Sequence, residues 1–134
     1  MTYLHLFYAP GLAALVLLTT LLHRYPRRPS PRTEAHQRAL VLLRSWLTPE
    51  QDEQWAARGE FEVVGSDTGT RYRITTRAVM NVQQLGEDGR PVAQWCFAPE
   101  GYLARGDVLL AQKIALETME REALALANSQ ELRV

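Results

Sequence analysis

The distribution of apolar and charged residues divides the chain into an uncharged N-terminal stretch and a mixed remainder. Residues 3–22 contain no Asp, Glu, Lys or Arg, and residues 11–22 are apolar almost throughout. About 20 apolar residues in a helix, at 1.5 Å each, cross a hydrocarbon core of roughly 30 Å. The pattern therefore predicts a transmembrane anchor over residues 1–23. The side chains expected in the membrane are Leu4, Phe7, Leu12, Leu15, Val16, Leu18 and Leu22.

Other interpretations of this apolar stretch stay open. A cleaved signal peptide would carry positive charge before the run and a small-x-small site after it, and this chain has neither. A helix lying in the membrane interface, a helix docked on a partner, or a buried core helix would also fit, because the run is near the lower length limit and contains Pro10 and Gly11. Length and flanking charge favour the spanning helix.

A basic, proline-rich linker over residues 24–33 follows the apolar run. Closely spaced prolines favour an extended backbone, and arginines near an anionic bilayer surface each contribute about 1 kcal/mol to binding. Positively charged flanks remain in the cytoplasm. We therefore expect a bacterial inner-membrane protein with its N-terminus outside and residues 34–134 in the cytoplasm. The expected headgroup contacts are Arg24, Arg27, Arg28 and Arg32.

The first part of the remaining sequence predicts two helices. Apolar residues recur at helical spacing over residues 33–46. A Thr-Pro-Glu-Gln capping box then starts a second helix over residues 48–58. We expect the two helices to form a hairpin that places Trp46 and Trp55 in the core.

The second part predicts a β-meander and a last helix. Apolar and polar residues alternate in four segments, about 60–64, 71–76, 78–85 and 91–97, separated by turn residues. A helix capped by Asp107 should run to about Asn128. The predicted fold class is α+β: a single transmembrane helix, a helical hairpin, a four-stranded antiparallel meander and a C-terminal helix. The residues of that helix expected to face the sheet are Val108, Leu109, Ala115, Leu116, Met119, Ala123, Leu126 and Ala127.

Composition argues against several functions. The whole chain has no net charge, but residues 34–134 contain 11 basic and 15 acidic residues, a net charge of −4. Nucleic acid is therefore not an expected partner, because duplex binding needs a basic footprint. No histidine follows His36 and the chain has a single cysteine, Cys96, so the commonest general base and the usual zinc ligands are missing from most of the domain. We predict no enzymatic activity and no cofactor.

Arginines on the predicted sheet form one candidate binding site. Arg71, Arg73 and Arg77 follow one another closely enough to grip an anion. The alternation of the strands, however, places Glu60 and Glu62 opposite the first two arginines, where cross-strand ion pairs would neutralise the charge. We favour the neutralised arrangement.

A second candidate is a partner-binding surface at the start of the last helix. Leu110 and Ile114 lie opposite its main apolar stripe, and Tyr102 and Leu103 precede them in the loop. Apolar residues on an outer helix face are typical of a protein contact. Burial of these first turns on both sides is the alternative. Gln112, within the stripe, is expected to hydrogen-bond the backbone of the sheet or a loop.

Residues 46–128 resemble a small domain found in uncharacterised bacterial proteins. The resemblance covers about 80 residues and implies a recurrent fold, but it carries no known activity. The matching pieces are Leu47-Thr48-Pro49-Glu50-Gln51, Gly65-Ser66, Arg71-Tyr72-Arg73-Ile74, Asn81-Val82, Cys96-Phe97-x-Pro99-Glu100, Asp107-Val108-x-Leu110-Ala111-Gln112-Lys113 and Leu116-Glu117.

These features together predict a non-catalytic, single-pass accessory or structural subunit of a larger membrane protein complex. Its expected partners are a membrane-embedded complex and the lipid bilayer. An energy-transducing complex, respiratory or photosynthetic, is one such host, although no residue identifies it. The alternative is a membrane-tethered binding module that recruits a soluble protein or an anionic ligand. An enzyme of unrecognised type is the third hypothesis.

Overall fold

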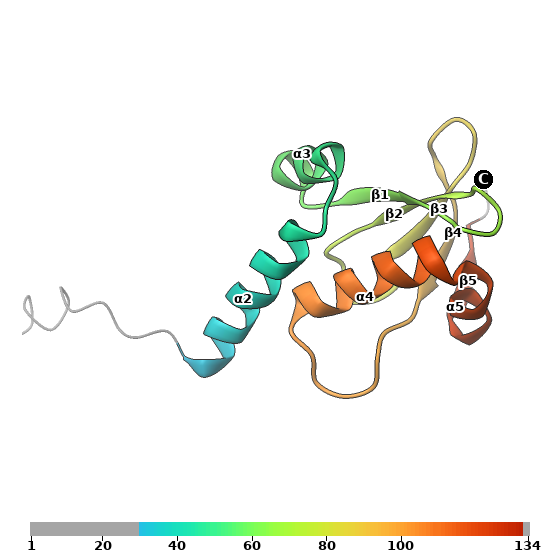
Figure 1. Cartoon of the computed structure of the whole chain (residues 1–134). Helices are drawn as coiled ribbons and strands as arrows, with labels where there is room; N and C mark the ends of the chain where they lie inside the picture. Colours follow the sequence, from blue (N-terminus) through green and yellow to red (C-terminus); the bar gives the residue numbers. More distant parts are fainter. Residues whose placement is uncertain (1–29, 133–134) are drawn as a thin grey trace, which may run out of the picture. The chain divides into compact units, whose positions relative to one another are not determined.

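Along the described residues, two helices are followed by four strands, two further helices and a fifth strand. The five strands form one antiparallel sheet (Figure 1). The computed structural model describes residues 30–132, and the predicted anchor at residues 1–23 lies outside them. Within the described part, no helix is both long and apolar enough to span a membrane. In chain order the elements are α2 (Pro31–Ser45), α3 (Pro49–Arg58), β1 (Phe61–Val64), β2 (Arg71–Ile74), β3 (Val82–Leu85), β4 (Pro91–Cys96), α4 (Arg105–Thr118), α5 (Glu120–Leu126) and β5 (Asn128–Glu131).

The sheet confirms the predicted meander and extends it by one strand. Its strand order is β1-β2-β3-β4-β5, with every neighbouring pair antiparallel. Phe61 pairs with Ile74 and Val63 with Tyr72, and all four side chains are buried. Alternation therefore puts one face of β1 and β2 in the core, as predicted, and leaves the polar residues between them on the other face.

Two strands differ from the prediction. The third begins only at Val82, because a loop over residues 75–81 is closed by a hydrogen bond from Thr75 N to Asn81 O at 2.8 Å. Met80 in this loop has a φ of 50°, which no strand accommodates. The fifth strand, β5, has an Asn-Ser-Gln-Glu sequence with every side chain exposed. It carries no apolar alternation, and the sequence therefore gives no sign of it.

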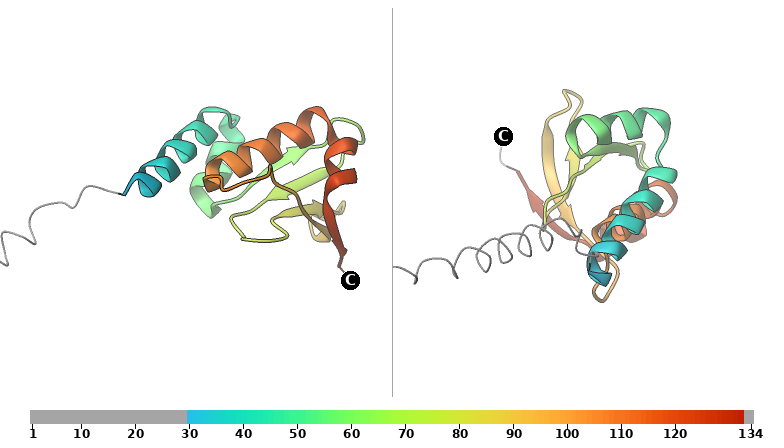
Figure 2. Two further views of the ribbon diagram at one scale, coloured as in Figure 1. Left: turned by 90° about the horizontal axis from the view of Figure 1, so that it is seen from below. Right: turned by 90° about the vertical axis from the view of Figure 1, so that its left-hand side faces the viewer.

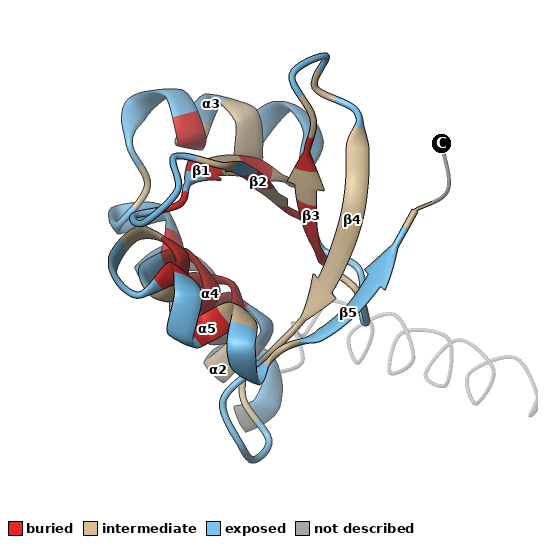
Figure 3. Cartoon of the chain, turned by 90° about the vertical axis from the view of Figure 1, so that its right-hand side faces the viewer, coloured by how far each residue is buried: buried red, intermediate tan, exposed pale blue. Residues whose placement is uncertain are grey.

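The core lies between the sheet and α4. Leu109 and Leu116 of α4 join the inward-facing residues of β1 and β2, and Leu43 of α2 completes the cluster. Figure 3 shows the sheet curving around α4 and α5, with the buried residues on the facing sides. Gly106 allows α2 and α4 to cross closely, because a Cβ there would lie 2.4 Å from the carbonyl of Ala39.

The two N-terminal helices exist but do not pack as the expected hairpin. The capping box of Thr48 and Gln51 is present and Gly59 ends α3 in a left-handed conformation. However, α2 packs on α4, while α3 packs on β1. Trp55 meets Phe61 edge to face with ring centroids 6.2 Å apart, as expected of a core residue. Trp46 is 57% exposed, so its predicted core position is wrong.

Helix α3 also covers the outer edge of the sheet (Figure 2). Gln51 Nε2 donates to Glu62 O at 2.9 Å, and Gln54 Oε1 accepts from Glu62 N at 2.8 Å. Two side-chain amides thus satisfy backbone groups of β1 that a neighbouring strand would otherwise bond. The polar residues of α3 therefore have a structural role that periodicity does not reveal.

The predicted C-terminal helix is two helices, which corrects the single helix from Asp107 to Asn128. Helix α4 ends at Thr118, Met119 has a φ of −151°, and α5 begins at Glu120. The first helix starts after Ala104, so Asp107 lies within its first turn and is not the cap. The break also turns Met119 and Leu126 outward, at 51% and 87% exposure, contrary to their expected burial.

Candidate binding site

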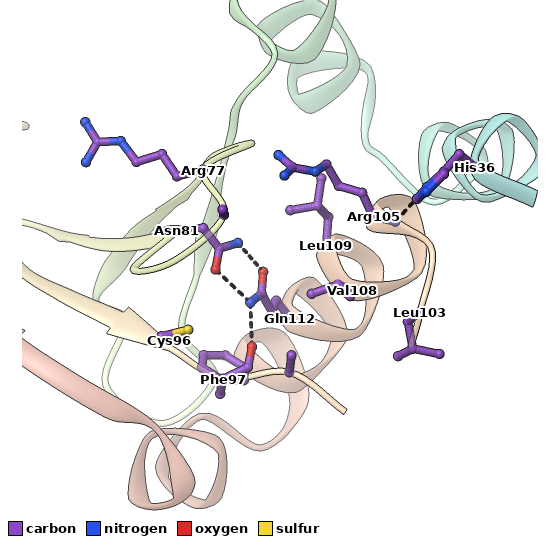
Figure 4. A pocket seen from close by; sticks show the side chains of 12 residues that line it. His36, Arg77, Asn81, Cys96, Phe97, Leu103, Arg105, Val108, Leu109 and Gln112 are labelled. Carbon is purple, nitrogen blue, oxygen red and sulfur yellow. Dashed lines mark hydrogen bonds between the residues drawn. The ribbon is translucent and has the colours of Figure 1, made fainter. Parts of the chain in front are cut away.

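A pair of buried amides joins α4 to the loops beside it (Figure 4). Gln112 Nε2 donates to Phe97 O at 2.6 Å and to Asn81 Oδ1 at 3.0 Å, while Asn81 Nδ2 donates to Gln112 Oε1 at 2.6 Å. Gln112 is 1% exposed. The bond to Phe97 O confirms the expectation that Gln112 bonds a loop backbone. Because both protons of Gln112 Nε2 are engaged, the pair acts as a structural clamp.

A cavity of about 260 Å³ lies beside this clamp. We call it the basic cavity, because basic side chains line it and no Asp or Glu does. Figure 4 shows Arg105 at the first turn of α4 and Arg77 in the loop before β3. The residues that line it include His36, Arg77, Phe97, Leu103, Arg105, Val108 and Leu109.

Arg77 is separated from the other two arginines of the predicted sheet cluster. Arg71 and Arg73 donate to Glu62 at 2.7 and 2.9 Å, so the predicted ion pairs are confirmed. Arg73 also lies 3.5 Å from Glu60. Burial opposes ionisation of Glu62, but the two guanidinium groups outweigh it and hold its pKa below the ordinary value. The sheet face carries little free positive charge as a result.

The loop before α4 is held against α2 by His36. Its Nδ1 accepts from Arg105 N at 3.3 Å, and its Nε2 lies 3.5 Å from the Tyr102 hydroxyl. The Arg32 guanidinium lies 4.4 Å from the centre of the Tyr102 ring. Of the four predicted headgroup contacts, Arg32 alone falls among the described residues. Arg24, Arg27 and Arg28, like the predicted membrane-span residues, lie outside them.

An apolar groove of about 460 Å³ runs along the other side of the clamp. It lies where the end of β4 and the start of β5 face α4 and α5. The apolar groove and the basic cavity share four lining residues, Cys96, Phe97, Ala98 and Gln112. The groove is also lined by Ala111, Ala115, Met119, Glu122, Ala123 and Leu126. The sequence missed this groove because it requires the helix break and the fifth strand.

The predicted partner-binding surface is not a single patch. Leu110 is 8% exposed and belongs to the core cluster, so its predicted position on an outer face is wrong. It points inward because α4 is covered by α2 as well as by the sheet. Tyr102 and Ile114 are exposed and Leu103 is half-buried in the basic cavity. Ile114 lies about 14 Å along the helix from Arg105, away from the loop.

Glu120 is the most deeply buried acid, at 0% exposure. Its carboxylate accepts from Asp67 N and Thr68 N, both at 2.8 Å, and from the Tyr72 hydroxyl at 2.7 Å. Burial opposes its ionisation, but these bonds and one from the Thr68 hydroxyl hold its pKa below the ordinary value. Burial, followed by the bond to Glu120, raises the pKa of Tyr72. A charged carboxylate with all its donors in place stabilises structure.

Nothing in residues 30–132 resembles a metal centre: no three His, Cys, Asp or Glu side chains there lie close enough to hold an ion. No protein-family model, curated protein or solved structure matches this chain. The resemblance to the small bacterial domain therefore stays a prediction. The basic cavity and the apolar groove are therefore the candidate binding sites of the described residues.

Proposed function

We propose that this chain is a non-catalytic accessory subunit of a membrane protein complex, and that its domain contacts a partner subunit through the apolar groove. The observation that supports this contact is that Met119 and Leu126 are large and exposed and line the groove. An exposed apolar patch beside a groove is typical of a protein contact. The apolar run of residues 3–22 supports membrane anchoring on the sequence alone.

The groove favours an amphipathic helix as its occupant. Ala98, Ala111, Ala115 and Ala123 line it, and such small side chains let a helix approach closely. Glu122 is the charged residue of the lining, so it complements a basic residue beside the apolar face of the partner. The partner is therefore a subunit segment with apolar residues at i, i+3 and i+4 and a flanking Lys or Arg.

The test substitutes the two exposed apolar residues that line the groove and leaves the core residues unchanged. Met119→Gln combined with Leu126→Gln should abolish stoichiometric co-purification from gently solubilised membranes, while the chain stays in the membrane fraction. Anchor residues of an interface typically contribute 2 kcal/mol or more, about a thirtyfold loss of affinity each. Native mass spectrometry measures the stoichiometry.

Val79→Gln is the matched control. Val79 is 68% exposed and does not line the groove, so this variant should co-purify as the wild type does. Circular dichroism melts check that all variants fold. Wild-type stoichiometry in the double variant would contradict the groove as the contact surface. A wild-type chain that purifies without any partner would contradict the accessory role.

A further inference from the structure

We infer that the basic cavity binds a small organic anion, a carboxylate or phosphate ester with an apolar body. The inference goes beyond the accessory role, since it concerns a different surface and needs no partner protein. It rests on three observations. Two arginines that line the cavity have no carboxylate partner, they belong to different elements, and apolar side chains line the cavity beside them.

The arginines that line this cavity differ from most others in the domain, because they have no carboxylate partner. Arg38, Arg44, Arg58, Arg71, Arg73 and Arg90 each lie within 4.0 Å of a carboxylate, and Arg32 lies over the Tyr102 ring. Among the described residues, the guanidinium groups without such a partner are those of Arg77, Arg105 and Arg121. Two of the three line the basic cavity. In a domain of net charge −4, this concentrates unpaired positive charge at one mouth.

The two arginines that line the cavity belong to different elements. In Figure 4 the Arg105 side chain extends from the first turn of α4 toward the loop that carries Arg77. The Arg77 guanidinium points away from the cavity in the same view. Both side chains are exposed, and exposed side chains change rotamer within nanoseconds. In the proposed complex Arg105 binds the oxyanion, and a rotamer of Arg77 turned toward the cavity would offer a second guanidinium group, whose planar geometry suits carboxylate and phosphate.

The interior of the cavity selects the rest of the ligand. Phe97, Leu103, Val108 and Leu109 contribute apolar walls. The side-chain N–H groups of Asn81 and Gln112 already donate to each other, to Thr75 O and to Phe97 O, so they are not free to donate to the anion. A ligand with its charged group at the mouth and a short hydrocarbon body inside matches this division, and about 260 Å³ limits it to a small molecule.

The experiment uses the purified full-length chain in a nonionic detergent, titrated by calorimetry with hexanoate, hexyl phosphate and uncharged hexanol. The two anions should bind and hexanol should not. Shortening hexanoate to butyrate should weaken binding by about fourfold for each buried methylene removed. Arg105→Gln and Arg77→Gln should each weaken anion binding by tenfold or more, because each removes a hydrogen bond to a charged group. Comparing the two anions identifies the preferred head group.

Arg121→Gln is the matched control, since Arg121 also lacks a carboxylate partner but does not line the cavity. It should bind both anions as the wild type does. The groove variant Met119→Gln/Leu126→Gln should also bind them normally, which keeps this test separate from that of the accessory role. The inference is overturned if wild-type protein binds neither anion at millimolar concentration, if hexanol binds equally well, or if the Arg77 and Arg105 variants bind like Arg121→Gln.

Discussion

At the scale of single residues, Glu120 determines how the last helices meet the sheet. Its carboxylate receives two backbone N–H groups, a threonine hydroxyl and the Tyr72 hydroxyl. Glu120 thereby joins α5 to the turn between β1 and β2 and to β2 itself. The side chain is fully buried, and burial of a charge is tolerated only where such donors surround it. A helix-surface glutamate would have been the ordinary expectation from sequence.

We therefore predict that Glu120→Gln strongly destabilises the domain. The amide keeps one acceptor but turns an NH₂ group toward groups that are themselves donors. The loss should be about 2–3 kcal/mol in the free energy of unfolding, measured by urea denaturation of the full-length chain. Glu122→Gln, an exposed neighbour on the same helix, should change it by less than about 0.5 kcal/mol. Equal effects of the two variants would contradict the prediction.

The same residue makes stability depend on pH. The pKa of Glu120 is lower in the folded state than the ordinary glutamate value of about 4.3. Its contribution is therefore complete above about pH 4.3 and is lost as pH falls toward the folded pKa, because the unfolded chain takes up the proton first. The difference in unfolding free energy between wild type and Glu120→Gln should narrow between pH 6 and pH 3. A constant difference over that range would show that Glu120 is not the titrating group.

At the scale of elements, the turn between β1 and β2 caps the break between α4 and α5. Ser66 N donates to Leu116 O at 2.9 Å, at the end of α4. The Ser66 hydroxyl and the Asp67 carboxylate accept from the N–H groups of Glu120 and Arg121, at 3.3 and 3.0 Å. A seven-residue helix such as α5 lacks the length to be stable alone. Its first turn is therefore stabilised by a loop more than 50 residues away in sequence.

Gly65 provides the test of this arrangement. A Cβ at Gly65 would lie 2.3 Å from the carboxyl carbon of Glu120. Gly65→Ala should therefore destabilise the domain by about 3 kcal/mol, through overpacking and displaced hydrogen bonds. At Gly69, in the same turn, φ is +71° and nothing lies within 4 Å, so Gly69→Ala should cost about 1 kcal/mol of backbone strain alone.

Hydrogen exchange distinguishes the two variants. Gly65→Ala should raise amide exchange in α5 and β5, because it displaces the carboxylate that holds α5 in place. Gly69→Ala should leave that region protected. Unchanged protection in Gly65→Ala would mean that the turn does not support the end of the chain. Equal loss in both variants would mean that the effect does not depend on the contact of Gly65 with Glu120.

At the scale of the whole molecule, the charges are divided between an N-terminal basic segment and a mildly acidic remainder. Residues 24–32 contain four arginines and no acid, and positive flanks of a membrane anchor remain cytoplasmic. Within the domain, the paired arginines of β2 leave the basic cavity as a separate positive site. In the proposed topology the linker would set the orientation in the membrane, and the proposed ligand binding would depend on the domain.

The proposed orientation, with the domain in the cytoplasm, leads to a labelling prediction. In a Cys96→Ser background, Glu87→Cys in the exposed turn between β3 and β4 should not react with an impermeant thiol reagent. The measurement uses cells whose outer membrane alone is permeabilised. Thr2→Cys, on the opposite side of the predicted anchor, should react. Labelling of Glu87→Cys before the inner membrane is disrupted would reverse the proposed topology.

The features that could be predicted from the sequence are those that depend on local interactions. The capping box at Thr48, the end of α3 at Arg58 and the pairing of Arg71 and Arg73 with glutamates all depend on neighbours within a turn or on strand alternation. The hydrogen bonds of Gln112 were also predictable in kind, because a buried amide inside an apolar stripe needs a partner. These inferences need no knowledge of which elements pack together.

Features that depend on contacts between distant parts of the chain could not be predicted from residue spacing. Leu110 is buried because α2 covers the second side of α4, and the last helix breaks at Met119 because Glu120 bonds a turn far away in the chain. The polar strand β5 forms because β4 offers it a free edge. The basic cavity and the apolar groove arise where these elements meet, so residue spacing could not reveal them. Local pattern specifies elements, whereas the sites of this protein are produced by their packing.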